Sequence, residues 1–181
     1  MERYGKAGTG TRHLTEYMLE LAKAYNREVD RPVWLQEFGV STEWMGAADR
    51  DDYLVAATEI SASVDGLWGI TWWCSHDVER SLTGFVELEY DLGLLTVDNE
   101  IKSLGHRFRE VVTALRNASA SPVVSRTTAV VLPDELTPDL EFADTFFTLI
   151  DRGVRPAIVL ASASRDAGYL RARGIEELVT V

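Results

Sequence analysis

The sequence of 181 residues is poor in cysteine, in histidine and in positive charge. Its one cysteine, Cys74, cannot form an internal disulfide bond and is expected to be a buried core residue. The three histidines are far apart, without metal-ligand spacing, so we expect neither a zinc site nor any other metal or cofactor. With 18 Lys and Arg against 29 Asp and Glu, the formal net charge of −11 argues against a nucleic-acid partner.

Long apolar runs are also missing, so the sequence predicts no membrane-spanning segment. The charged N-terminal residues 1–13 are not followed by an apolar segment, so no signal peptide is evident. The simplest expectation is a cytoplasmic protein, unless the chain has lost a leader. The composition, with 46% hydrophobic residues, is that of a globular protein. The length is sufficient for one domain with a hydrophobic core, or for two small domains.

Hydrophobic periodicity predicts alternating helices and strands in the first part of the chain. Helices are expected over 14–25, 49–64 and 101–115, and buried strands over 33–39 and 67–74, with a long acidic loop at 75–95. The apolar stripe of the first helix is expected to be Leu14, Tyr17, Met18, Leu21 and Tyr25. Helices and strands joined by short connections indicate βα units around a parallel sheet.

A small polar stretch that ends at Pro122 divides the chain into residues 1–117, a linker at 118–122, and residues 123–181. The second unit repeats the pattern, with strands expected at 127–132, 157–161 and 178–181 and helices at 140–150 and 165–171. A complete (β/α)8 barrel takes about 250 residues and rarely fewer than about 200. We therefore expect an α/β protein that combines the C-terminal portion of a TIM barrel with a partial flavodoxin- or Rossmann-like domain.

The strand at 33–39 ends in an ionisable group, Glu37, directly before Phe38 and Gly39. A buried carboxylate is costly unless it is paired or used, and ligands of parallel α/β folds lie at the carboxyl ends of the strands. Strand alternation places Glu37 on one face with Val33 and Leu35, which predicts that it points toward the interior. A structural carboxylate paired with an arginine, or a strand end in solvent, is the alternative.

The next strand ends in paired tryptophans, part of a total of five in the chain. Alternation places Trp73 on the interior face, near the same rim as Glu37, where a flat indole suits the apolar face of a sugar ring. Trp72 has the opposite parity and is expected to pack between sheet and helices. His76 and Asp77 on the following loop, and Trp44 on the loop after Glu37, are further candidates for sugar contacts, with solvated loop residues as the alternative.

The elements R-P-V-W-L-Q-E-F-G, G-I-T-W-W-C-S and D-L-G-L-L, each separated by a helix or loop, resemble the last part of a clan A glycoside hydrolase. The nearest likeness is to the cellulases and mannanases of family 5, over about residues 11–117. The resemblance implies a retaining β-glycoside hydrolase, with Glu37 as the nucleophile and Trp73 as the floor of a sugar subsite. The second unit is similar to the noncatalytic amidotransferase-like domain that follows the barrel in some glycosidases.

The resemblance also implies an acid/base glutamate from an Asn-Glu pair that ends the fourth strand. The one such pair here, Asn99-Glu100, follows the last expected barrel strand and is interpreted as the acidic start of a helix. We therefore expect a fragment that carries the nucleophile and acts on an oligo- or polysaccharide, completed by a missing barrel portion or a homo-oligomer. A noncatalytic carbohydrate-binding or assembly module, and a different barrel enzyme with Glu37 as general base, remain alternatives.

Overall fold

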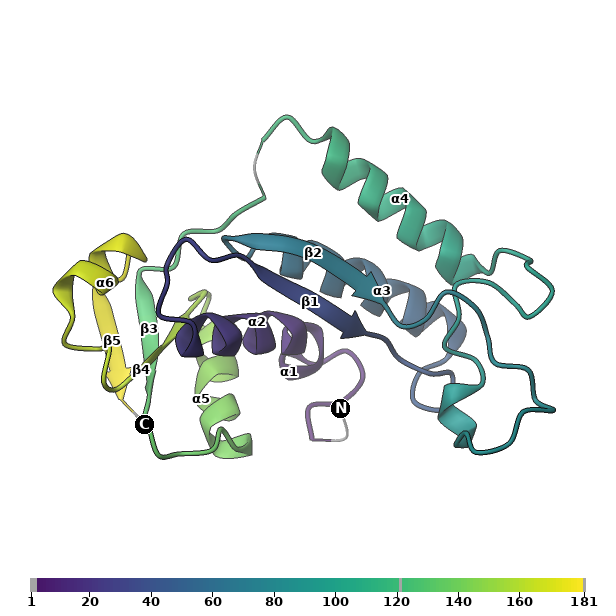
Figure 1. Ribbon diagram of the computed structural model, residues 1–181, viewed down its shortest axis with the longest axis horizontal. Coiled ribbons are helices and arrows are strands. Elements are labelled where there is room, and N and C mark those ends of the chain that lie inside the picture. The colour runs from purple at the N-terminus through teal and green to yellow at the C-terminus, as the bar shows by residue number, and fades with distance from the viewer. Residues whose placement is uncertain (1–2, 121, 181) are drawn as a thin grey trace.

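The strands of the protein form two small parallel sheets in a computed structural model that describes residues 3–120 and 122–180 (Figure 1). In the first sheet, β1 (Val33–Phe38) pairs with β2 (Leu67–Trp72). The second sheet has the order β4-β3-β5, formed by β3 (Thr128–Leu132), β4 (Ala157–Leu160) and β5 (Glu177–Thr180). The expected parallel α/β architecture is confirmed. Two paired strands do not define a barrel, so the partial barrel and the separate second domain remain predictions.

The helices lie close to the positions that periodicity predicts. They are α1 (Thr9–Arg12), α2 (Leu14–Tyr25), α3 (Ala47–Ala62), α4 (Ser103–Asn117), α5 (Leu140–Asp151) and α6 (Ala167–Ala172), with a 3-10 turn η1 (Glu87–Glu89) in the long acidic loop. Local chemistry explains the boundaries of α5. The side chain of Asp139 accepts a hydrogen bond from the Phe142 amide at its start, and Gly153 adopts a positive φ of 82° just after its end. Among the described residues, no helix is long and apolar enough to traverse a lipid bilayer.

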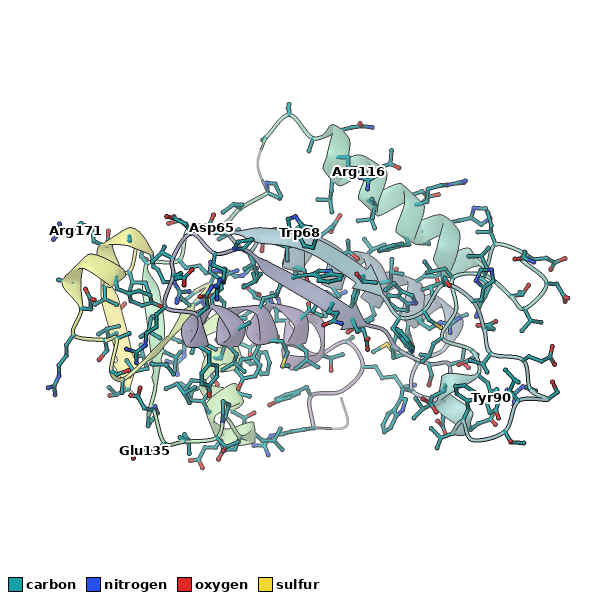
Figure 2. All side chains as sticks on the ribbon, viewed as in Figure 1. Asp65, Trp68, Tyr90, Arg116, Glu135 and Arg171 are labelled. Carbon is teal, nitrogen blue, oxygen red and sulfur yellow. The ribbon has the colours of Figure 1, made fainter. Side chains whose placement is uncertain are left out.

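The first hydrophobic core lies between the β1–β2 sheet and helices α3 and α4. Val33, Leu35 and Phe38 of β1 and Trp72 of β2 pack there against apolar residues of both helices, including Leu54 and Leu104. The opposite face of this sheet is open, and Figure 2 shows Trp68 on β2, whose side chain is 72% exposed. Burial against the helices therefore orients both strands, and it sets which side chains face the open side.

Helix α2 belongs to both parts of the molecule, because it packs on β1 and α3 on one side and on β4 on the other (Figure 1). Leu19 lies in the first core, whereas Tyr17 and Ala24 lie in the second, among Phe142, Phe146 and other residues of α5, β3 and β4. The predicted single apolar stripe is therefore wrong in part: Met18 and Tyr25 are each 53% exposed. A helix packed on two sides needs two buried faces, which a single stripe cannot supply.

The second face of α2 buries charge. Glu16 and Glu20 are fully buried and face basic side chains that come from residues after the proposed linker. Arg126 and Arg155 contact Glu16, and Arg126 and Arg173 contact Glu20. The division at 118–122 remains a prediction, with Ser121 outside the described residues. The packing across it is extensive, because α2 contributes to the cores on both sides.

Candidate active site

A cavity of about 680 Å³ opens at the carboxyl ends of β1 and β2. Glu37, Trp44 and Trp73 all line it, together with residues of the loop after β1, the acidic loop, the N-terminal segment and the start of α5. Small-molecule sites typically have volumes of about 300–1,000 Å³. Three of the five side chains predicted from the sequence therefore meet in one cleft of suitable size.

Glu37 lies on a different face of β1 from the one that strand alternation predicts. The pairing of β1 with β2 is irregular between Leu35 and Phe38, and Phe38 continues the buried face in place of Glu37. Glu37 consequently lies on the exposed side, opposite the helix-facing core that holds Val33 and Leu35. The predicted shared face is wrong, because a register shift reverses the alternation of side chains.

The carboxylate of Glu37 is left free by its surroundings. Within residues 3–120 and 122–180, no hydrogen bond or salt bridge to its carboxylate is found, so the arginine-paired alternative does not describe this strand end. The buried Arg50 does not contact Glu37 and instead donates to the backbone carbonyl of Asp91 at 3.0 Å. An unpaired, solvent-accessible carboxylate is available to a ligand.

The two tryptophans at the end of β2 face opposite ways, as parity predicts. Trp72 is 4% exposed, packs edge-to-face on Phe38 and donates its indole N–H to the Leu92 carbonyl at 2.8 Å. The expectation that Trp72 is a core residue is confirmed. Trp73 is 50% exposed and lines the cleft together with Glu37.

Close contact between backbones keeps Glu37 and Trp73 together. The amide of Trp73 donates to the Phe38 carbonyl at 2.9 Å, which extends the strand pairing to the rim. A Cβ at Gly39 would lie 2.5 Å from the Trp73 carbonyl oxygen, closer than real Cβ atoms come. Glycine at position 39 therefore permits the approach of the two strand ends that bear the candidate side chains.

His76 and Asp77 lie on the loop after β2 but do not line the cleft. Asp77 accepts hydrogen bonds from the Gly93 amide at 2.9 Å and from Lys102 Nζ at 2.6 Å. A ring nitrogen of His76 lies 3.0 Å from the Asn99 side-chain oxygen. These contacts fold the long loop onto the start of α4, so the structure gives both residues partners within the protein rather than a place in the cavity.

Lys102 is a structural residue that no pattern in the sequence indicates. Besides Asp77 it donates to the Asp91 carbonyl at 3.0 Å, and the adjoining Leu92 carbonyl receives the Trp72 indole. Lys102 and Arg50 thus hold Asp91 and the adjoining Leu92 next to Trp72, at the end of β2. A lone lysine or arginine in an amphipathic helix gives no sequence signal for this role, since most such residues face solvent.

Two other groups near the cleft stay protonated. Tyr4 lines the cavity, and burial, followed by interaction with Asp144, raises the pKa of its phenol to about 12. Burial also raises the pKa of the Cys74 thiol, which donates to the His76 carbonyl at 3.0 Å. Cys74 is therefore held as a thiol rather than as a nucleophilic thiolate. Within the described parts of the chain, no group of three His, Cys, Asp or Glu side chains could hold a metal ion.

No family model matches the sequence, and no curated protein matches it either. Solved structures do. The chain is similar to GH5_18 from Streptomyces cattleya in complex with GlcNAc, with 39% identity and a TM-score of 0.91 over 99% of this chain and 45% of that chain. It is also similar to a variant of GH5_18 from Bifidobacterium longum subsp. longum in complex with Manβ1-4GlcNAc, with 33% identity and a TM-score of 0.89 over 98% and 44% of the two chains.

An exo-β-1,4-mannosidase from Opitutaceae bacterium strain TAV5 shares the fold at 23% identity, with a TM-score of 0.65 over 86% of this chain and 29% of that chain. The close structural neighbours of the protein are thus glycoside hydrolases of family 5, and its α/β fold is similar to theirs. The chain spans about 45% of the length of the first of these structures.

The comparisons narrow the family resemblance. These neighbours are GH5_18 proteins and a mannosidase, so the expectation of a cellulase has no support. The alignment with GH5_18 extends over 99% of this chain and therefore includes the second unit. The specific likeness of that unit to an amidotransferase-like domain gains no support from them and remains a prediction.

Proposed function

We propose that this chain carries the nucleophile side of a retaining β-glycoside hydrolase active site. The observation that carries the proposal is the cleft at the ends of β1 and β2, which brings Glu37, Trp44 and Trp73 together. The sugar ligands of the GH5_18 neighbours, GlcNAc and Manβ1-4GlcNAc, support a β-mannosyl-GlcNAc glycoside as the substrate class.

In this proposal the carboxylate of Glu37 attacks the anomeric carbon while the leaving-group oxygen takes a proton from a second carboxyl group. A covalent glycosyl-enzyme results, and water hydrolyses it with the second group now acting as base. The nucleophile has to be ionised, which suits an exposed carboxylate without a counter-ion. Trp73, half-exposed beside Glu37, offers its ring as the platform for the sugar whose anomeric carbon reacts.

The acid/base group is proposed to come from outside residues 1–181. Retaining enzymes hold their two carboxyl groups about 5–5.5 Å apart. Asn99-Glu100 does not fulfil this role, because neither residue lines the cleft: Asn99 contacts His76, and the Glu100 amide bonds to Thr96 Oγ1 at 3.1 Å. A chain that spans under half of its structural neighbours leaves room for a second carboxylate elsewhere.

A chimera tests this proposal directly. The part of the Streptomyces cattleya GH5_18 chain that precedes the aligned region is fused to residues 1–181, and release of mannose from Manβ1-4GlcNAc is measured. We expect turnover by the chimera and none by the 181-residue chain alone. Glu37→Gln should reduce turnover of the chimera by several orders of magnitude while leaving disaccharide binding in place.

Glu43→Gln, on the same loop, is the matched control and should leave turnover within a few-fold of the unmodified chimera. A mechanism-based fluorosugar adds a second readout, because it should label Glu37 in the chimera only. If a folded chimera binds the disaccharide without turnover, the noncatalytic carbohydrate-binding alternative replaces the proposal. Turnover that survives Glu37→Gln would assign the nucleophile to another residue.

A further inference from the structure

A second cavity, remote from the cleft, lies at the junction of the two sheets. It has a volume of about 140 Å³ and is lined by Lys23 of α2, Arg126 before β3, Arg173 after α6, and Asp65 before β2, with Val29, Ala157 and residues 123–125 completing it. We call it the junction cavity. Figure 2 labels Asp65 at this side of the molecule, near the start of β2.

Arg126 has donors without an acceptor at this cavity. Its side chain is only 5% exposed, and its Nη1 donates to the Pro156 carbonyl at 3.1 Å and contacts Glu16 at 2.5 Å. Its Nη2 is buried and has no hydrogen-bond partner, and its Nε, 3.2 Å from Glu20, makes no hydrogen bond of acceptable geometry. Buried guanidinium donors are rarely left unsatisfied, because the cost of desolvating them is then uncompensated.

The charge around the junction cavity is unbalanced toward the positive. Three of the residues that line it are basic, namely Lys23, Arg126 and Arg173, and among the described residues that line it the one carboxylate is Asp65. Asp65 lies 3.9 Å from Lys23 and has a side chain 75% exposed. Glu16 and Glu20 contact these basic side chains but do not line the cavity, so its lining carries an excess of positive charge.

The charged form of Lys23 is disfavoured at this position. Burial lowers the pKa of its ammonium group, and the attraction of Glu20 and Asp65 opposes this shift only in part, because Arg173 and Arg126 add repulsion. An additional anion beside Lys23 would favour its charged form.

We propose that the junction cavity binds a small oxyanion of the phosphate type, held by Arg126 Nη2 and Lys23 Nζ. The volume sets the size of the ligand, since about 140 Å³ is well below the roughly 300 Å³ at which sites for larger organic ligands begin. Guanidinium and ammonium groups are the side chains that proteins use most for phosphate. The bound anion would join α2 of the first unit to residues of the second, which makes it a structural ligand independent of the proposed hydrolase chemistry.

The test is titration of the 181-residue chain with sodium phosphate at constant ionic strength, made up with sodium chloride. We expect a saturable rise in Tm with phosphate and none with chloride alone, together with exchange broadening of the phosphate ³¹P resonance. Glycerol phosphate forms the second arm: binding of both ligands assigns the site to the phosphate group, and binding of inorganic phosphate alone assigns it to the free ion.

Lys23→Gln should weaken phosphate binding about tenfold or more, as expected for loss of a charge-assisted hydrogen bond. Arg107→Gln, which removes an exposed arginine paired with Glu110 on α4, is the matched control and should leave binding unchanged. The ³¹P measurement on the unmodified chain decides the question even if Lys23→Gln fails to fold. A Tm that follows ionic strength alone, without ³¹P broadening, overturns the proposal, and so does unchanged binding by folded Lys23→Gln.

Discussion

The carboxylates at the cleft and those at the junction between the sheets differ in burial and in pairing. At the cleft, Glu37 is exposed at a strand end and unpaired within the described residues. At the junction, Glu16 and Glu20 are fully buried and surrounded by basic side chains. The first arrangement leaves a carboxylate free for chemistry, and the second uses carboxylates to compensate buried positive charge that comes from distant parts of the chain.

The contrast implies that the buried carboxylates at the junction serve stability, whereas the exposed carboxylate at the cleft is free for reaction. Removing one partner of a buried ion pair is expensive because the other charge stays buried without compensation. Removing an exposed, unpaired carboxylate costs little, because water already solvates it. We therefore expect substitutions at the two places to have opposite consequences for folding and for activity.

The largest expected effect is on stability at the junction. Glu16→Ala leaves Arg126 and Arg155 without their shared acceptor and should lower the free energy of unfolding by about 3–5 kcal/mol. Glu37→Ala should change it by no more than about 0.5 kcal/mol. Urea denaturation of both variants, followed by tryptophan fluorescence, measures the difference. Equal losses at the two positions would remove the contrast.

Acid should reduce the stability that Glu16 contributes at the junction. Burial raises the pKa of Glu16, but the hydrogen bond with His13 and the charges of Arg126 and Arg155 outweigh it and hold the pKa below its ordinary value. A carboxyl whose pKa is lower in the folded state contributes stability above its unfolded pKa and loses it as the pH falls through the folded pKa. The free energy of unfolding should therefore fall below about pH 4.5, the region of the ordinary value.

Glu16→Gln is the control for the pH dependence, because it cannot titrate at position 16 and should flatten the acid slope. Urea midpoints measured from pH 7 to pH 3 compare the two chains. An unchanged slope in the variant would assign the acid sensitivity to other carboxyl groups.

A small effect on folding, and a selective one on binding, is expected at the exposed tryptophans. Trp34 and Trp73 are each 50% exposed, but only Trp73 lines the cleft. Replacement of either by alanine should cost about 1 kcal/mol of stability. In the chimera, Trp73→Ala should weaken Manβ1-4GlcNAc binding about tenfold and Trp34→Ala should leave it unchanged. Equal weakening by both would argue against Trp73 as the sugar platform.

Local patterns in the sequence predict the elements of the fold well. The strands around Leu35 and Val159 and the helix around Val111 have the expected type and nearly the expected bounds, since each rests on short-range periodicity and turn residues. The opposite orientations of Trp72 and Trp73 also follow from alternation along one strand.

Features that depend on pairing between distant segments could not be predicted. The register irregularity after Leu35, which turns Glu37 to the open face, arises from how β1 meets β2. The burial of Glu16 and Glu20 depends on arginines more than a hundred residues away, so the first helix looks amphipathic with one stripe although it packs on two sides. Neither the register irregularity nor the burial of these glutamates leaves a periodic signal in the sequence.

The two-sided packing of α2 has a consequence for how the chain folds. Glu16 meets Arg155 across 139 positions, and Glu20 meets Arg173 across 153, so the second core and these buried ion pairs are complete only when distant segments close on one helix. Loop closure of this length costs entropy before contacts repay it, and folding rates fall as contacts become less local. Stopped-flow refolding should therefore show the second core forming in a slow phase. Helix α2 would be among the first segments to form and among the last to be fixed in its final packing.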